Sequence, residues 1–486
     1  RILLIDNIIL IGLDAGLLGF VSDERKTLVN TLKSAGKQAS DMTSALADYI
    51  QTNTFETGSA RAARVLLADK VKLYNLGSGD LKQLVSQLIE QGLTTDQIND
   101  TFASYINTSI TSDSATQRSA RMMLAKTLYD QGWAQNITDS GGVGEKALVD
   151  AVFAQSRTLS NINAIAQFKL LDVNHSGAQR GEYLGKLIDM DAALSPLMYA
   201  NLTGDLTLEK TNFLNGMIAR DPALISGIEN LVDLDGKSGF LRALYLGKIM
   251  DMNQVLNNNS SVLLANLSGD SVAQKKDLIN RLVSANKSPE SVQSVVLHIG
   301  SSQETGLDRA ERVLLALAIQ NASLNVNMTD EVADKQALVD GLFAQNKRAG
   351  TFSPSSLTGY IDTSIPQNAS TRMQMILLAD KLDSLSLGHN IADEDGGKKA
   401  LISALITAGM GASDLNDVVA SYVDVLSENG PTRAARILLA HSLASFGFGA
   451  GMISGDEHKR SLTNLLFDAG KRYGDMTSDL SLLISA

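Results

Sequence analysis

The chain has 486 residues, of which 44% are apolar and 20% charged, and this composition supports extensive buried cores rather than disorder. Its net charge of −11 argues against a nucleic-acid partner, because an acidic surface cannot neutralise phosphates. The absence of cysteine excludes disulfides and cysteine-ligated metals. The most apolar stretch, 1–20, is interrupted by Asp6 and Asp14, so we expect no membrane insertion.

The first predicted element is a helix over residues 1–12, RILLIDNIILIG, which aligns with RILLAHSLASFG at 436–447. Both belong to a recurring helical pattern, here called pattern C, that begins around an arginine. Its other copies read RAARVLLADK (61–70), QRSARMMLAKTL (117–128), QRGEYLGKLIDM (179–190), LRALYLGKIMDM (241–252), RAERVLLALA (309–318) and TRMQMILLADKL (371–382), and the copy that includes 436–447 begins as RAARILLAHS (433–442).

A second pattern, A, precedes each later copy of C. Its apolar residues fall at i, i+1, i+4 and i+5, which places them on one face of a helix. Gly, Asn or another polar residue often follows, as expected at a helix C-cap. The copies start near residues 26, 81, 145, 209, 275, 335, 398 and 458.

A third pattern, B, follows A within a few residues and places Ser, Thr or Asp at a helix N-cap, as in TTDQIND (94–100) and SDLNDVV (413–419). Three copies add proline at the first helical position: DPALISG (221–227), SPESVQS (288–294) and SPSSLTG (353–359). The order is always A, B, C.

Equivalent pattern-A residues, from Leu28 to Leu462, are separated by 56 to 65 residues, with a mean of 62. We therefore predict an all-α chain with a tandem array of about seven three-helix repeats, either solenoid-like or as stacked helical bundles. The predicted repeats span 23–78, 79–143, 144–207, 208–272, 273–332, 333–395 and 396–455, with a partial repeat (C only) at 1–22 and another (A and B only) at 456–486.

The two partial repeats complement each other, because the first supplies pattern C and the second supplies A and B. Repeat proteins normally finish with polar capping repeats, and neither end has that character. We expect the chain to join itself head to tail, as a homo-oligomer or as the continuation of a longer chain. The predicted assembly interface comprises Ile2, Leu3, Ile5, Leu480, Leu482 and Leu483.

Four copies of pattern C carry two arginines three residues apart, on one helix face. Such pairs can bind phosphate or carboxylate ligands. Their recurrence favours ion pairs with acidic residues within or between repeats. The pairs are Arg61 with Arg64, Arg118 with Arg121, Arg309 with Arg312, and Arg433 with Arg436.

A weak calcium candidate is DVNHSG (172–177), where Asp172, Asn174 and Ser176 match the first half of a calcium loop. The position that needs a bidentate glutamate holds Tyr183, so a polar turn is the competing interpretation. The histidines are dispersed, and no nucleophile elbow or phosphate loop occurs. We expect no catalytic or cofactor-binding residues, no cofactor and no enzymatic activity.

Twelve Asn-x-Ser/Thr sequences are present. They permit glycosylation, or they reflect loops rich in Asn and Ser.

Two functions remain in competition. The first is a structural, self-assembling protein, a subunit or segment of an extracellular filament, sheath or surface layer, located outside the cell or at its surface. The alternative is an α-solenoid scaffold that binds a protein or peptide partner. An enzyme would need a pocket in a divergent repeat, and residues 145–270 diverge most.

Overall fold

The computed structural model describes residues 1–19, 21–53, 55–139, 141–169, 174–194, 196–233, 235–300, 302–448 and 455–476. Over these ranges the protein is all-helical, and its only extended pairings are isolated bridges. The predicted all-α class is therefore confirmed. Among the described helices, none combines the length and apolarity needed to cross a membrane.

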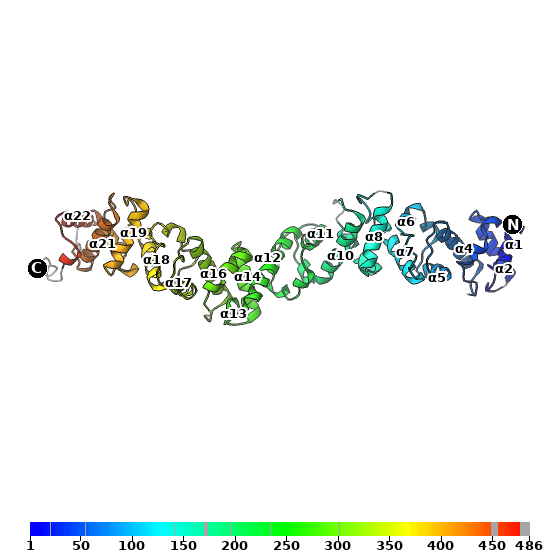
Figure 1. The fold of residues 1–486 in the computed structure, drawn as a ribbon, viewed down its shortest axis with the longest axis horizontal. Helices are drawn as coiled ribbons and strands as arrows, with labels where there is room; N and C mark the ends of the chain where they lie inside the picture. The colour runs from blue at the N-terminus through cyan, green and yellow to red at the C-terminus, as the bar shows by residue number, and fades with distance from the viewer. Residues whose placement is uncertain are drawn as a thin grey trace. The chain divides into compact units, whose positions relative to one another are not determined.

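The chain divides into two compact units. Unit 1 contains residues 1–229 and 234–247, and unit 2 contains residues 230–233 and 248–486. Each unit is built from long helices joined by short helical turns, as Figure 1 shows.

The pattern-A segments form the first set of helices. They are α2 (Val21–Ser34), α5 (Leu81–Glu90), α8 (Val143–Ala154), α11 (Leu206–Met217), α14 (Ser271–Ser284), α17 (Ala333–Ala344), α19 (Glu394–Thr407) and α22 (Gly455–Asp468). Their buried residues follow the expected spacing, with Leu28, Val29 and Leu32 in α2.

The pattern-C segments form the second set. They are α1 (Ile2–Leu10), α4 (Gly58–Leu73), α7 (Ala115–Asp130), α10 (Gly177–Ala193), α12 (Gly239–Asn258), α16 (Gly306–Asn321), α18 (Ala369–Ser384) and α21 (Gly430–Ser445). Residues 239–247 of α12 belong to unit 1, and the remainder of this helix belongs to unit 2.

The pattern-B segments are shorter than full helices. They form α3 (Ser44–Ala47), α6 (Asp100–Ser104), α9 (Leu159–Ile165), α15 (Pro289–Val295) and α20 (Asp417–Ser421), together with 3-10 turns such as Ala39–Asp41. Helix α13 (Ser260–Leu263) directly follows α12.

The core of each unit lies where pattern-A and pattern-C helices pack together. Helix α2 packs on α4, α5 on α7 and α8 on α10 in unit 1. In unit 2, α14 packs on α16, α17 on α18 and α19 on α21. Helix α21 also contacts α22, so it lies between two pattern-A helices (Figure 1).

Most predicted helix ends are confirmed. The pattern-A helices other than α11 end at left-handed residues, among them Gly36 and Asn346. At the first of these ends, the Lys37 N–H donates to the Leu32 carbonyl at 3.0 Å, as in a Schellman motif. The N-cap predicted at Ser413 is wrong. The cap is Gly411, because the Asp414 carboxylate accepts the Gly411 N–H at 2.8 Å and starts the turn two residues earlier.

Glycine at the first position of several pattern-C helices allows two backbones to touch. A Cβ placed on Gly306 would lie 1.9 Å from the Gln274 carbonyl oxygen in α14, and one on Gly58 would lie 2.0 Å from the Glu24 carbonyl oxygen in α2. The Gly306 N–H also donates to the Gln274 side chain at 2.6 Å. Alanine occupies the equivalent position in α7 and α18. The pairs α5–α7 and α17–α18 therefore accommodate a methyl group between the two helix backbones.

We predict that Gly306→Ala destabilises unit 2 by about 1–3 kcal/mol, because the new methyl group forces α16 away from the backbone of α14. Gly350→Ala is the matched control, since a Cβ there meets no atom within 4 Å. Urea unfolding followed by circular dichroism measures both variants. Equal stabilities of the two variants would contradict this account of the close approach.

Candidate functional site

Every pattern-C helix from α4 onward holds a buried arginine at its fourth residue. The side chains of these arginines are almost completely inaccessible, with relative exposures of 0 or 1%. They are Arg61, Arg118, Arg180, Arg242, Arg309, Arg372 and Arg433. A buried guanidinium has lost its hydration and must be satisfied by protein groups.

Six of the seven buried arginines donate to backbone carbonyls more than 40 residues earlier in the chain. The seventh, Arg118, donates to the nearby carbonyls of Asn107 and Ile110. Arg309 donates to the carbonyls of Val262, Ala265 (3.2 Å) and Ser302 (2.9 Å). This arrangement of a buried pattern-C arginine on loop carbonyls is here called the arginine clamp. Other clamps join Arg61 to Leu13 and Ala15, Arg372 to Leu324 and Val326, and Arg433 to Leu387 and His389, at 2.6–3.2 Å.

The residue five positions before each clamp arginine faces its guanidinium in most cases. It is a carboxylate in four clamps, and the ion pairs are Arg61–Glu56, Arg118–Asp113, Arg309–Glu304 and Arg433–Glu428. In a fifth clamp, the Arg372 Nε donates to the Gln367 side chain at 2.7 Å. The remaining two clamps have His175 and Lys237 at this position.

Desolvation lowers the pKa of four clamp arginines below its ordinary value. They are Arg118 and the three that have no carboxylate five residues earlier, Arg180, Arg242 and Arg372. The clamp therefore retains an arginine even without the ion pair, which indicates that the carbonyl contacts are the shared feature.

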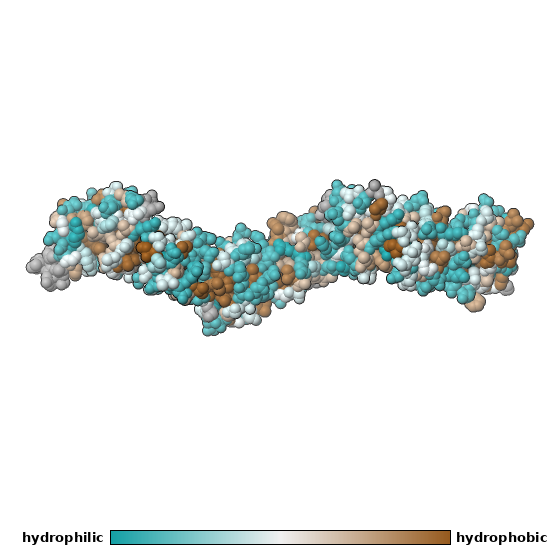
Figure 2. Space-filling model, in the orientation of Figure 1, coloured by the Kyte–Doolittle hydropathy of each residue, from teal (hydrophilic) through white to brown (hydrophobic). Residues whose placement is uncertain are grey.

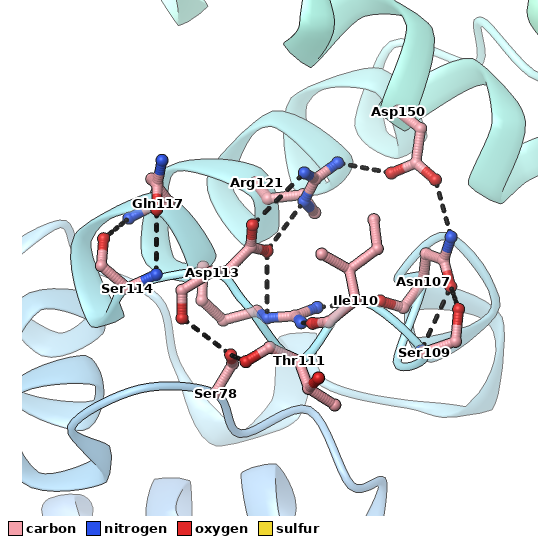
Figure 3. Close-up of polar contacts among 11 residues, drawn as sticks. Ser78, Asn107, Ser109, Ile110, Thr111, Asp113, Ser114, Gln117, Arg121 and Asp150 are labelled. Carbon is pink, nitrogen blue, oxygen red and sulfur yellow. Dashed lines mark hydrogen bonds and ion pairs between the residues drawn. The ribbon is translucent and has the colours of Figure 1, made fainter.

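The same loops are tied together by isolated parallel bridges. They pair Leu17 with Glu56, Ile137 with His175, Leu202 with Lys237, Leu267 with Glu304, Met328 with Gln367, and Ile391 with Glu428. In each, the N–H after the first residue donates to the carbonyl of the second, as from Ser268 to Glu304 at 2.9 Å. The Arg118 clamp uses a different tie. There, the Ser78 hydroxyl donates to the Thr111 and Asp113 carbonyls at 3.1 and 2.8 Å (Figure 3).

A second arginine, three residues after the clamp, connects to the next pattern-A helix. Figure 3 shows Arg121 between two carboxylates: Asp113, just before its own helix α7, and Asp150 of α8. Arg312 likewise joins Glu304 to Asp340 of α17, and Arg436 donates to Asn464 of α22 at 2.6 Å. Arg64 pairs with Glu56 and donates to Ser86 of α5 at 2.9 Å.

Phenylalanine reinforces three of these connections. The guanidinium carbons of Arg121, Arg312 and Arg436 lie 4.2–4.4 Å from the ring centroids of Phe153, Phe343 and Phe467, each on the next pattern-A helix. Stacking of this kind suits the planar guanidinium. The arginine pairs thus bind carbonyls, carboxylates and aromatic rings of the protein itself.

Sequence reasoning singled out eight arginines and missed Arg180, Arg242 and Arg372. These three lie at the clamp position but have Tyr183, Tyr245 and Met375 where the second arginine would be. The signal was present in the alignment of pattern C, because a single arginine recurs in all seven later copies. This single recurring arginine is easily missed when only pairs of arginines are considered.

Four of the glycosylation sequences coincide with the bridges. Asn136, Asn201, Asn266 and Asn327 adopt left-handed backbone conformations immediately before a bridge residue, and the following Thr or Ser supplies the bridging N–H. The Asn327 side-chain amide donates to the Thr363 carbonyl at 2.7 Å. Asparagine tolerates this conformation better than most residues, so loop geometry accounts for these four sequences.

The other predicted residues are distributed as follows. Ile2 and Leu3 are exposed on α1, and Ile5 is half-buried. Leu480, Leu482, Leu483 and the calcium candidate Asp172 lie outside the described residues. Asn174 is exposed, and the Ser176 hydroxyl caps α10 by accepting the Gln179 N–H. Within the described ranges, no three His, Asp or Glu residues are placed to hold a metal.

Unit 2 contains one buried histidine. His298 is 8% exposed in the 3-10 turn Val296–His298, near Lys335 and Glu331. Desolvation, assisted by the positive charge of Lys335, lowers its pKa from the ordinary value of 6.5.

Comparisons of the chain with protein families, curated protein sequences and solved structures gave no match. The arginine clusters therefore have to be interpreted from their own geometry. Because their donors are directed at carbonyls and carboxylates of the protein, they act as ties between segments.

We predict that Arg309→Met lowers the stability of unit 2 by about 3–5 kcal/mol, because Glu304 and several carbonyls lose their buried partner. Arg309→Lys should recover little of this loss, since an ammonium cannot fork between two loops. The control is Arg281→Met, which removes the partly exposed pair with Glu311 and should cost less than about 1 kcal/mol. Denaturant unfolding of the three variants checks this, and equal losses for Arg309→Met and Arg281→Met would disprove the clamp's role.

The lowered pKa of His298 predicts a pH dependence of stability. The unfolded chain binds this proton more tightly than the folded protein does, so the contribution is complete above pH 6.5 and is lost as the pH falls below that value. We expect His298→Gln to flatten the loss of stability on acidification in unfolding curves measured at several pH values. An unchanged slope would show that His298 is not the group responsible.

Proposed function

We propose that the protein is a structural, self-assembling repeat protein, a subunit or segment of an extracellular filament, sheath or surface layer. In this proposal its architecture is about seven three-helix repeats with the boundaries given by the sequence. Each repeat is tied to the next by an arginine clamp and a bridge, except at Arg118, where the clamp carbonyls lie in the same repeat and the Ser78 hydroxyl replaces the bridge. The partner is the protein itself, joined head to tail, without nucleic acid or membrane insertion.

The observation that carries this proposal is the recurrence of one clamp at the same position of seven helices. An enzyme or receptor concentrates unusual buried charges at one place, whereas here the same buried charge recurs and its donors contact the protein itself. Recurring self-contact of this kind is what a repetitive structural element requires. The cysteine-free composition fits a location outside the cell, where free thiols would be oxidised.

A specific feature favours the scaffold alternative. A groove of about 710 Å³ lies in unit 1, between α4 and the end of α5. It is lined by both apolar and polar residues, including Ala63, Leu66, Ile89, Leu93 and Asp96. A peptide partner that binds along pattern-C helices would use a groove of this type.

Electron microscopy and sedimentation velocity of the 1–486 chain separate the two functions. Self-assembly predicts elongated or closed oligomers whose mean mass rises with protein concentration. A scaffold predicts a monomer that stays monomeric up to the solubility limit. That second result would contradict the structural proposal and leave the groove as the functional feature.

A further inference from the structure

Helix α1 has one covered face and one exposed apolar face. Leu4 and Ile8 are buried, and α1 contacts the 3-10 turn Ala39–Asp41. Ile2 and Leu3, by contrast, are 76% and 72% exposed, and Figure 2 shows apolar surface where Figure 1 places α1. Ile437, the residue of α21 that aligns with Ile2, is 0% exposed.

Equivalent helices identify what kind of element covers such a face. Helix α4 contacts the pattern-A helix and short B helix that precede it, α2 and α3, and α21 contacts α19 and α20 in the same manner. The exposed face of α1 is therefore shaped to receive a pattern-A helix with its B segment.

Helix α22 is a pattern-A helix whose apolar face is incompletely covered. Leu465 is 70% exposed, and Leu462 and Leu466 are half-buried. Leu462 and Leu466 align with Leu28 and Leu32 of α2. These two leucines of α2 are completely buried where α4 packs. Helix α22 is thus suited to receive a helix of the α4 type.

An ion pair marks this type of helix packing elsewhere in the protein. Lys37, directly after α2, pairs with Asp69 of α4, and Lys347, after α17, pairs with Asp380 of α18. Each lysine follows the left-handed residue that ends its pattern-A helix. Each aspartate occupies the same position of its pattern-C helix, five residues after the site of the second arginine.

The two halves of such a pair are present and exposed, one shortly after α22 and the other on α1. Lys471 follows left-handed Gly470, and Asp6 lies five residues after Arg1, which aligns with Arg436. The backbone at Lys471 also matches that at Lys347. Arg472 stacks on Phe467 and donates to the Phe467 and Lys471 carbonyls, as Arg348 does with Phe343 and Lys347.

We propose that α1 of one copy docks on α22 of a second copy in the way that α4 docks on α2, with Asp6 paired to Lys471. The apolar contact covers Ile2 and Leu3 of the first copy together with Leu465 of the second. The opposite charges fix the register, because electrostatic complementarity selects among otherwise similar apolar contacts. This inference rests on the proposed function and specifies its interface.

Charge reversal tests the register without removing part of the fold. Deleting residues 1–20 would be ambiguous, since Leu13 and Ala15 supply the carbonyls of the Arg61 clamp. We instead compare the 1–486 chain with Asp6→Lys, Lys471→Asp and the double variant by sedimentation velocity. Glu90→Lys, at an exposed position of α5, is the matched control.

Each single reversal should weaken association by at least about tenfold, because it places like charges opposite each other. The double variant should recover most of the association, and Glu90→Lys should associate as the parent chain does. Association that is unaffected by the single reversals, or not restored in the double variant, would overturn this interface while leaving self-assembly intact. A parent chain that remains monomeric would overturn both proposals.

Discussion

The structure depends on burying guanidinium groups against backbone carbonyls, even though single N–H groups such as the Nε of Arg242 have no hydrogen-bond partner. An arginine removed from water is destabilising unless its N–H groups find acceptors, and the only acceptors shared by all seven sites are loop carbonyls. In six of the seven clamps, a segment more than 40 residues earlier in the chain therefore approaches the beginning of a pattern-C helix. For Arg309, this requirement brings residues 262–265 and 302 to one side chain. The connection between successive segments follows from this requirement.

The surrounding sequence features serve the same junction. Glycine at the first residue of α16 lets the helix approach α14 until their backbones touch. The left-handed Asn266 turns the chain into the bridge between Leu267 and Glu304. Glu304 then contributes both its backbone, to the bridge, and its carboxylate, to Arg309 and Arg312. One junction thus links glycine, asparagine, glutamate and arginine positions that look unrelated in the sequence.

Local patterns predicted the long helices well, because amphipathic periodicity and caps are encoded within a few residues. The i, i+1, i+4 spacing placed Leu338, Val339 and Leu342 correctly in a buried face. Most junctions were not predictable in this way, because they depend on carbonyls some 45 residues away, as between Arg61 and Ala15, whose separation is 46. The Arg118 clamp is the exception, since its carbonyls are 8 and 11 residues away. The single arginines Arg180, Arg242 and Arg372 were overlooked because each lacks a second arginine three residues later. Asn327 likewise resembled a glycosylation site until its left-handed conformation and bridge were known.

Hydrogen exchange at individual bridge amides measures the clamp most directly. The Ser268 N–H donates into the bridge beside Arg309, and the Thr329 N–H donates into the bridge beside Arg372, both in unit 2. If each clamp holds its own junction, Arg309→Met should greatly accelerate exchange at Ser268 and leave Thr329 protected. Unchanged protection at Ser268 would contradict the claim that the buried arginine holds these segments together.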